Sequence, residues 1–425
     1  MKIKSIKIEN LFEIFNYDIK YPTDENVLIL TGPNGFGKTK VLNIIFNLFN
    51  KKFLFFQKLV FDKIIIFLEN DISIEIEKNN SAFIFKEGNK KIGTLNYNLK
   101  GNKNLLRNIE SYLPIARIGE EEWVDRRTDR ILSIEELITE YADHLPDKLS
   151  KPIKIVESDR INEILDSINV HLIREQRLFK KVSITENSYH DEKDQTVMIE
   201  AIKTYASELE KLIDSKSLES YRIYQTLDSS YTDRLISEKN QLSKDEFNKR
   251  LEKLKIRQDK LAKHGIYESN QKIMYSKDDA KALLVYLNDL EKKLGIFDDL
   301  LEKLELFTSI LNERRFTFKS IIIDQEKGFY LKTSNDKELE LNQLSSGEQH
   351  EVVLLYELIF NTKPNIFVLI DEPEISLHVT WQKEFLNDLL RIIKIQKFQV
   401  LIATHSPSII NDRWDLVYNL EKTDH

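Results

Sequence analysis

The sequence contains no cysteine. Disulfide bonds, cysteine-ligated zinc, iron–sulfur clusters and thiol nucleophiles are therefore excluded. No apolar run approaches the roughly 18–20 residues that a membrane helix needs, and the longest candidate, Lys63–Glu69, is bounded by charge. Residues 1–8 alternate apolar and polar side chains, which predicts a strand rather than a secretion signal. We expect a soluble, cytoplasmic protein that makes no membrane contact.

Glycine and proline are also scarce, with 11 and 8 residues in a chain of 425. The few glycines are informative because several cluster in two short motifs. Hydrophobic residues make up 41% and aromatic residues 10%, which excludes a disordered chain. At roughly 150 residues per domain, the length suggests two to three units.

The sequence also has no excess of positive charge: it contains 63 basic and 70 acidic residues, which gives a net charge of −7. This argues against an evenly basic nucleic-acid binder, although a local basic patch is compatible with an acidic total. The simpler interpretation of the basic residues is solvated surface charge. The candidates for a basic groove are Lys2, Lys4, Lys7, Arg126, Arg127 and Arg130.

Short apolar runs separated by helical patterns predict a doubly wound α/β sheet. Between about 60 and 100 the apolar residues alternate with polar ones, which predicts an additional antiparallel sheet. The runs that we expect to be buried parallel strands are Val27–Thr31, Ile366–Ile370 and Val400–Ala403, and Val170–Ile173 is expected to be a further strand.

Residues 197–315 are nearly free of glycine and proline and are rich in Lys, Glu and Leu. We expect antiparallel helices, with a turn at His264-Gly265, that form a coiled-coil or small helical-bundle insertion; the alternative is an ordinary helical domain. The domains would then be 1–195, 196–316 and 317–425. The longest heptad-spaced seam is Leu283, Leu287, Leu290, Leu294, Phe297, Leu301, Leu304 and Leu311, and shorter ones run over 247–261 and 198–212.

Residues 32–39 fit the phosphate-binding pattern G-x-x-x-x-G-K-T between a predicted strand and a predicted helix. Glycines let the backbone turn its N–H groups toward phosphate, and the following helix adds its positive end. Lys38 would reach the β- and γ-phosphates, and Thr39 would ligate Mg²⁺. The residues expected to bind nucleotide here are Gly32, Pro33, Asn34, Gly35, Phe36, Gly37, Lys38, Thr39 and Lys40.

Three further motifs follow in order. Asp371 and Glu372 end an apolar strand, where carboxylates face the ligand crevice of a parallel sheet. Leu344–Gln349 combines hydroxyls with glycine at a predicted helix start, which suits an anion; the alternative is a plain helix cap with Ser346 as N-cap. His405 ends the last apolar strand, where an imidazole can hydrogen-bond phosphate or water.

Together these motifs resemble the ABC-type ATPase superfamily, in the branch of SMC, RecF-like and OLD-type ATPases. The resemblance covers about the first 50 and the last 110 residues. The matching segments are Gly32–Thr39 (Walker A), Leu344–Gln349 (signature), Val368–Glu372 (Walker B), Ser376–His378 (D-loop region) and His405 (switch).

Within that branch the chain is similar to ATPase subunits of anti-phage systems, and most of all to those of Septu systems, which also occur in some retrons. That family acts with a separate HNH nuclease. The segments that carry this likeness are Asp371–His378, Ala403–Asp415, Arg117–Gly119 with Trp123, and Asp125–Thr128.

The resemblance implies an ABC-type P-loop ATPase head that uses ATP and Mg²⁺ and forms a head-to-head dimer with two composite sites. Catalysis would fall to Lys38, Glu372 and His405. The ion would be held by Thr39, Asp371 and Gln176, the Q-loop position. The signature residues that would contact the nucleotide of the other subunit are Ser345, Ser346, Gly347 and Glu348.

Some positions keep alternatives open. Arg177, rather than Gln176, is a second candidate to contact phosphate or a partner. Ser346 replaces the first glycine of the usual L-S-G-G pattern, and Asn10–Glu13 lacks the basic residue that relatives often carry near the phosphate. Phe12 or Phe15 would stack on adenine, or else belong to the core.

The leading hypothesis is an ATPase that serves as the sensor or regulatory subunit of a defence complex with a separate nuclease. Only 20 residues follow His405, too few for a nuclease domain of the TOPRIM type, so we expect another chain to cut. The alternative is an SMC- or RecF-like ATPase that binds DNA in repair or chromosome maintenance. A transporter ATPase is disfavoured because about 310 residues, rather than about 100, separate Gly32 from Leu344.

Overall fold

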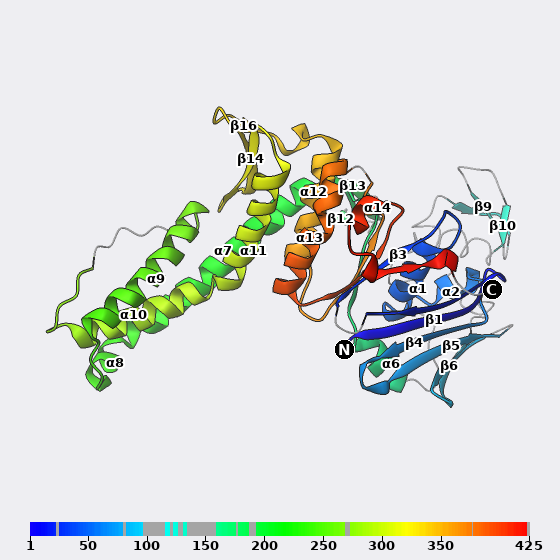
Figure 1. The fold of residues 1–425 in the computed structure, drawn as a ribbon, viewed down its shortest axis with the longest axis horizontal. Coiled ribbons are helices and arrows are strands. Elements are labelled where there is room, and N and C mark those ends of the chain that lie inside the picture. Colours follow the sequence, from blue (N-terminus) through cyan, green and yellow to red (C-terminus); the bar gives the residue numbers. More distant parts are fainter. Residues whose placement is uncertain are drawn as a thin grey trace. The chain divides into compact units, whose positions relative to one another are not determined.

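The computed structural model describes residues 1–22, 25–79, 82–96, 115–119, 122–125, 131–133, 159–175, 177–186, 193–267, 273–375 and 377–422. The chain divides into two compact units (Figure 1). Unit 1 holds residues 1–176, 181–197 and 362–425, and unit 2 holds residues 177–180 and 198–361. None of the described helices combines the length and apolarity needed to cross a bilayer.

A five-stranded parallel sheet forms the centre of unit 1, in the order β11-β17-β18-β3-β19. All five residues of β17 and of β18 are buried, as expected for strands covered on both faces. The three runs predicted to be buried parallel strands are therefore confirmed, and the further strand predicted at Val170–Ile173 joins the same sheet. The strands are β3 (Val27–Thr31), β11 (Val170–Ile173), β17 (Phe367–Asp371), β18 (Gln399–Ala403) and β19 (Val417–Asn419).

An antiparallel sheet, in the order β2-β1-β4-β5-β6-β7, adds a second layer of strands to unit 1. One face is apolar: Ile64 pairs with Ile76 and Ile66 with Ile74, and all four side chains are buried. The alternation predicted from the sequence is thus confirmed. The strands are β1 (Ile3–Leu11), β2 (Phe15–Lys20), β4 (Lys63–Leu68), β5 (Ser73–Lys78), β6 (Ala82–Glu87) and β7 (Lys90–Asn96).

Five described helices accompany these sheets, and the first of them, α1, follows β3 directly. Its buried stripe of Val41, Leu42, Ile45 and Leu48 has the predicted helical spacing and belongs to the core of unit 1. The helices are α1 (Lys38–Phe49), α2 (Leu54–Lys58), α6 (Asp159–Asp166), α13 (Val379–Gln396) and α14 (Pro407–Ile410). Two small sheets complete the strands: β8 (Ile115–Arg117), β9 (Glu122–Asp125) and β10 (Ile131–Ser133), and the pair β12 (Phe179–Glu186) and β13 (Lys193–Glu200).

Unit 2 is mainly helical, with one antiparallel sheet of three strands. Its helices are α7 (Ala201–Ser229), α8 (Tyr231–Ser237), α9 (Lys244–Lys263), α10 (Ala280–Gly295), α11 (Asp298–Ile310) and α12 (Ser346–Tyr356). The strands are β14 (Lys319–Asp324), β15 (Gly328–Thr333) and β16 (Glu338–Leu339), and π-helical turns extend α11 over Leu311–Arg315 and α12 over Glu357–Asn361.

The predicted leucine seam is buried along nearly its whole length, but it does not lie on one helix. Helix α10 ends at Gly295, and α11 begins at Asp298. Gly295 weakens the end of α10 because glycine is a poor helix former, and the acidic pair Asp298 and Asp299 favours a new helix start. The buried seam positions are Leu287, Leu290, Leu294, Phe297, Leu301, Leu304 and Leu311.

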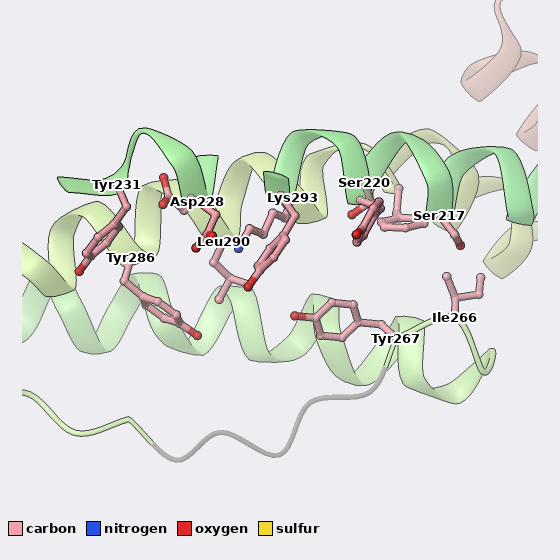
Figure 2. A pocket seen from close by; sticks show the side chains of 13 residues that line it. Ser217, Ser220, Asp228, Tyr231, Ile266, Tyr267, Tyr286, Leu290 and Lys293 are labelled. Atoms are coloured by element: carbon pink, nitrogen blue, oxygen red, sulfur yellow. The ribbon is translucent and has the colours of Figure 1, made fainter. Parts of the chain in front are cut away.

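A cavity of about 790 Å³ lies among the helices of unit 2 (Figure 2). Five tyrosines line it, together with Asp228, Asp289 and Lys293. The ammonium of Lys293 lies 4.0 Å from the ring centre of Tyr224, and burial lowers the pKa of Lys293. The cavity contains none of the predicted nucleotide-binding residues. The tyrosines are Tyr221, Tyr224, Tyr231, Tyr267 and Tyr286.

Gly328 lets β15 approach α7 closely, and this contact yields a stability prediction. Its φ of +68° is left-handed, and a Cβ would lie 1.9 Å from the carbonyl oxygen of Ala206. We expect Gly328→Ala to destabilise the protein by about 3 kcal/mol or more, measured by urea unfolding. Gly265→Ala is the control, since its φ is +67° and no atom lies within 4 Å of the added Cβ. An equal, small loss in both variants would refute the close approach.

Candidate functional site

The predicted phosphate-binding loop runs from the end of β3 to the start of α1. Gly32, Gly35 and Gly37 have φ values of 146°, 90° and 80°, in the region that glycine adopts without strain. The Tyr17 hydroxyl, from β2, donates a 2.7 Å hydrogen bond to the carbonyl oxygen of Phe36. This hydrogen bond ties the middle of the loop to strand β2 of the antiparallel sheet. The glycines of the loop occupy the positions at which its backbone has a positive φ.

Lys38, the first residue of α1, reaches back across this loop. Its ammonium donates to the carbonyl oxygens of Gly32 (2.8 Å) and Pro33 (3.2 Å) and lies 3.4 Å from Nδ1 of His405. Burial lowers the pKa of Lys38, and the nearby carboxylates of Glu372 and Asp371 oppose this. A partly dehydrated ammonium in the mouth of a glycine loop is a strong partner for phosphate.

Thr39 and Asp371 form the second element of the site. The Thr39 hydroxyl donates to Oδ1 of Asp371 at 3.1 Å. Asp371 is only 8% exposed, and burial raises its pKa to about 6. A buried carboxylate gains from a cation beside it, and hydroxyl and carboxylate oxygens are ligands that Mg²⁺ accepts. The residues present therefore fit a magnesium ion next to the phosphate loop.

Glu372 and His405 meet where the neighbouring strands β17 and β18 end. Asp371 pairs with Ala403 in the sheet, and the Glu372 N–H donates to the Ala403 carbonyl oxygen at 2.9 Å. Glu372 has a left-handed φ of 44°. Its Oε1 lies 3.8 Å from Nε2 of His405. Glu372 and His405, both predicted to be catalytic, are thus side by side, with Lys38 against the opposite ring nitrogen of His405.

Sequence reasoning assigned no role to Glu374, which the structure places in the same site. Its Oε1 accepts hydrogen bonds from the backbone N–H groups of His405 (2.7 Å) and Ser406 (3.2 Å). Glu374 is part of the Asp-Glu-Pro-Glu run, but nothing in that run indicates which backbone its side chain would reach. The hydrogen bond from Tyr17 to the phosphate loop was missed as well, because no local pattern indicates that the Tyr17 hydroxyl reaches Phe36.

The signature segment lies in unit 2. Ser345, not Ser346, is the N-cap of α12: its hydroxyl accepts from the Glu348 N–H at 3.4 Å, and Glu348 accepts from the Ser345 N–H at 2.9 Å. The capping prediction was therefore off by one residue, because the reciprocal box needs the carboxylate three positions after the cap. Burial alone would raise the pKa of Glu348, but hydrogen bonds from Lys319 and Ser345 hold it below its usual value.

Other predicted residues have different positions. Gln176, Ser376, Arg126, Arg127 and Arg130 lie outside the described residues. Arg177 is buried and belongs to unit 2.

The two phenylalanines offered for adenine stacking lie near the loop. The Phe15 ring centre lies 5.2 Å from that of Phe36, and the Phe12 ring lies close to Gly37. Both side chains also pack against the core of unit 1, so the stacking role stays a prediction.

The lysines offered for a DNA groove already have partners. Lys2 donates to Asn26, Lys4 pairs with Asp71, and Lys7 pairs with Glu9. These contacts agree with ordinary surface charge.

A glycine loop between a buried parallel strand and a helix, a lysine in its mouth and a threonine–aspartate pair define a P-loop nucleotide-binding protein. The family model described as the AAA ATPase domain matches residues 1–410. The chain therefore belongs to the AAA ATPase domain family. No curated protein matches it.

Solved structures similar to the chain include SMC head domains. One, from Pyrococcus furiosus, has an extended coiled coil bound to the C-terminal domain of ScpA; it is 13% identical with a TM-score of 0.40, covering 96% of this chain and 90% of the other. The SMC head domain from Thermotoga maritima is 11% identical with a TM-score of 0.34, covering 99% and 94%. An SMC head bound to the C-terminal winged-helix domain of ScpA is 11% identical with a TM-score of 0.39, covering 96% and 91%.

Proposed function

We propose that the chain binds and hydrolyses ATP with Mg²⁺ at the C-terminal edge of its parallel sheet. The observation that carries this proposal is the convergence of Lys38, the Thr39–Asp371 pair and the Glu372–His405 pair at one sheet edge. Ligands of parallel α/β sheets bind at this edge, and phosphoryl transfer needs positioning and charge stabilisation rather than covalent chemistry.

Each residue has a distinct task in this proposal. The backbone N–H groups of the glycine loop and the ammonium of Lys38 hold the phosphates. Thr39 and Asp371 hold magnesium, which supplies charge neutralisation at the phosphates when bound. Glu372 orients and polarises the attacking water, and His405, beside it, hydrogen-bonds phosphate or water. Gln176 remains a candidate ligand for the ion.

We further propose that two copies join head to head, so that each signature segment completes the site of the other copy. The Walker residues belong to unit 1 and the signature to unit 2. Ser345 and Ser346 are exposed, so they are accessible to a second chain. The start of α12 offers backbone N–H groups to a phosphate, as anion sites at helix starts do, and the Ser345 hydroxyl, which here donates to Glu348, lies beside them.

Light scattering with a nonhydrolysable ATP analogue tests this arrangement. We expect the molecular mass to double on addition of analogue and Mg²⁺, because the nucleotide contributes contacts to both copies. Ser345→Arg should keep nucleotide binding and lose the doubling, since a bulky side chain would fill the contact. A monomeric mass at saturating analogue would refute the composite site.

The wider role that we propose is that of a regulatory subunit of an anti-phage complex with a separate HNH nuclease. Its support is the likeness of the Asp371–His378 and Ala403–Asp415 segments to Septu ATPases. The division into 1–195, 196–316 and 317–425, with a coiled-coil insertion, belongs to this proposal. Copurification with an HNH protein encoded next to this gene, and DNA cleavage controlled by ATP, would support it. Steeply salt-dependent DNA binding by the chain alone would instead favour the SMC- or RecF-like alternative.

A further inference from the structure

The carboxylate of Glu374 connects the two strand ends that carry the reacting groups. Glu374 follows β17 by three residues, and His405 follows β18 by two. One oxygen of Glu374 accepts from two successive backbone N–H groups, at 2.7 Å and 3.2 Å. Hydrogen bonds from N–H groups to a carboxylate are about twice as strong as neutral ones. This contact therefore fixes the backbone from which the His405 imidazole projects.

A second tether holds the same loop. The Ser406 hydroxyl donates to Oε1 of Gln382 at 2.7 Å, and the amide of Gln382 donates to the Leu377 carbonyl oxygen at 3.0 Å. The segment after β17 is thus bound to the segment after β18 at two points. Only the contact of Glu374 is made directly to the N–H of His405.

The second oxygen of Glu374 is costly for stability. Its Oε2 is buried and has no hydrogen-bond partner among the residues that the structure describes. A buried acceptor without a partner destabilises the folded state, so a side chain present only for stability would be expected to satisfy both oxygens. This geometry fits a residue whose role is to position the backbone of His405 and Ser406 through its other oxygen, Oε1.

We propose that Glu374 is a positioning residue for hydrolysis: it holds His405 against Glu372 and Lys38, and turnover depends on it while ATP binding does not. The inference rests on the proposed ATPase activity. His405 is 3.8 Å from Glu372 and 3.4 Å from Lys38, so a small rotation of its backbone breaks both approaches. Among the described residues Glu374 makes no hydrogen bond to the phosphate loop and acts on Lys38 only through its charge, which is why nucleotide affinity is expected to persist.

The test compares Glu374→Ala with Glu374→Gln in the full chain. We expect the alanine variant to lose at least tenfold in kcat while the Kd for a fluorescent ATP analogue stays within twofold. The glutamine variant should keep kcat within threefold, because its amide oxygen can accept the same two N–H groups. In a His405→Ala background, Glu374→Ala should cause no further loss, since the two residues would act as one unit.

Asp412→Ala, which removes an exposed carboxylate from the same unit, is the matched control and should turn over like the wild type. If Glu374→Ala does not fold, Glu374→Asp replaces it, because the shorter side chain withdraws the carboxylate. Unchanged kcat in the alanine variant, equal loss in the glutamine variant, or additive losses with His405→Ala would each overturn this inference alone. An absence of turnover in the wild-type chain would overturn the proposed function together with it.

Discussion

Lys38→Ala is expected to weaken ATP binding by at least about 100-fold, because it removes the cation held in the mouth of the phosphate loop. The same substitution removes the bonds from the ammonium to the carbonyl oxygens of Gly32 and Pro33, so the empty loop also loses an internal contact. Titration calorimetry with ATP and Mg²⁺ measures the affinity directly. Helix α1 should persist, since alanine favours helix and the buried stripe of α1 is unchanged.

Two further variants define this experiment. Lys383→Ala removes an exposed lysine from α13 of the same unit and should leave the affinity unchanged. Lys38→Arg keeps the charge but not the compact ammonium, and we expect it to bind weakly as well, because the guanidinium does not fit where the ammonium meets two carbonyl oxygens. Unchanged affinity in Lys38→Ala would remove the phosphate-loop assignment.

Glu372→Gln is expected to bind ATP normally, to hydrolyse it at least about 100-fold more slowly, and to accumulate as the nucleotide-bound dimer. A neutral amide cannot polarise the attacking water as a carboxylate does, whereas the phosphate contacts of Lys38 are untouched. Steady-state phosphate release gives the rate, and light scattering in ATP gives the mass.

The matched comparison is Glu374→Gln, two residues away in the same segment. Both substitutions replace a carboxylate by an amide, but the role of Glu372 toward water needs the negative charge, whereas that of Glu374 needs an acceptor oxygen, which an amide also supplies with weaker hydrogen bonds. We therefore expect slow turnover in the first variant and near-normal turnover in the second. Normal turnover in Glu372→Gln would exclude Glu372 from catalysis and leave His405 as the candidate that acts on the attacking water.

Much of the site could be predicted because its residues come in contiguous runs. The glycine loop is a local structure: positive φ at Gly35 and Gly37 and the helix start at Lys38 follow from residue types within eight positions. The strand Phe367–Asp371 was recognisable as an apolar run that ends in carboxylates. The interval between α10 and α11 was harder to see, because the heptad spacing continues across it.

The sequence by itself determined the class of this protein, because the phosphate loop, the buried parallel strands and the carboxylates at a strand end are each encoded by a short contiguous run of residues. Only the tertiary structure decided which side chains meet. Asp371 and Ala403 are 32 positions apart and Thr39 is more than 300 positions from both, yet the order β17-β18-β3 brings the ends of β17 and β18 and the loop that leads from β3 to Thr39 to one edge. The contact of Glu374 with the His405 backbone arises there for the same reason: sheet register depends on pairing between distant segments, which no local pattern encodes.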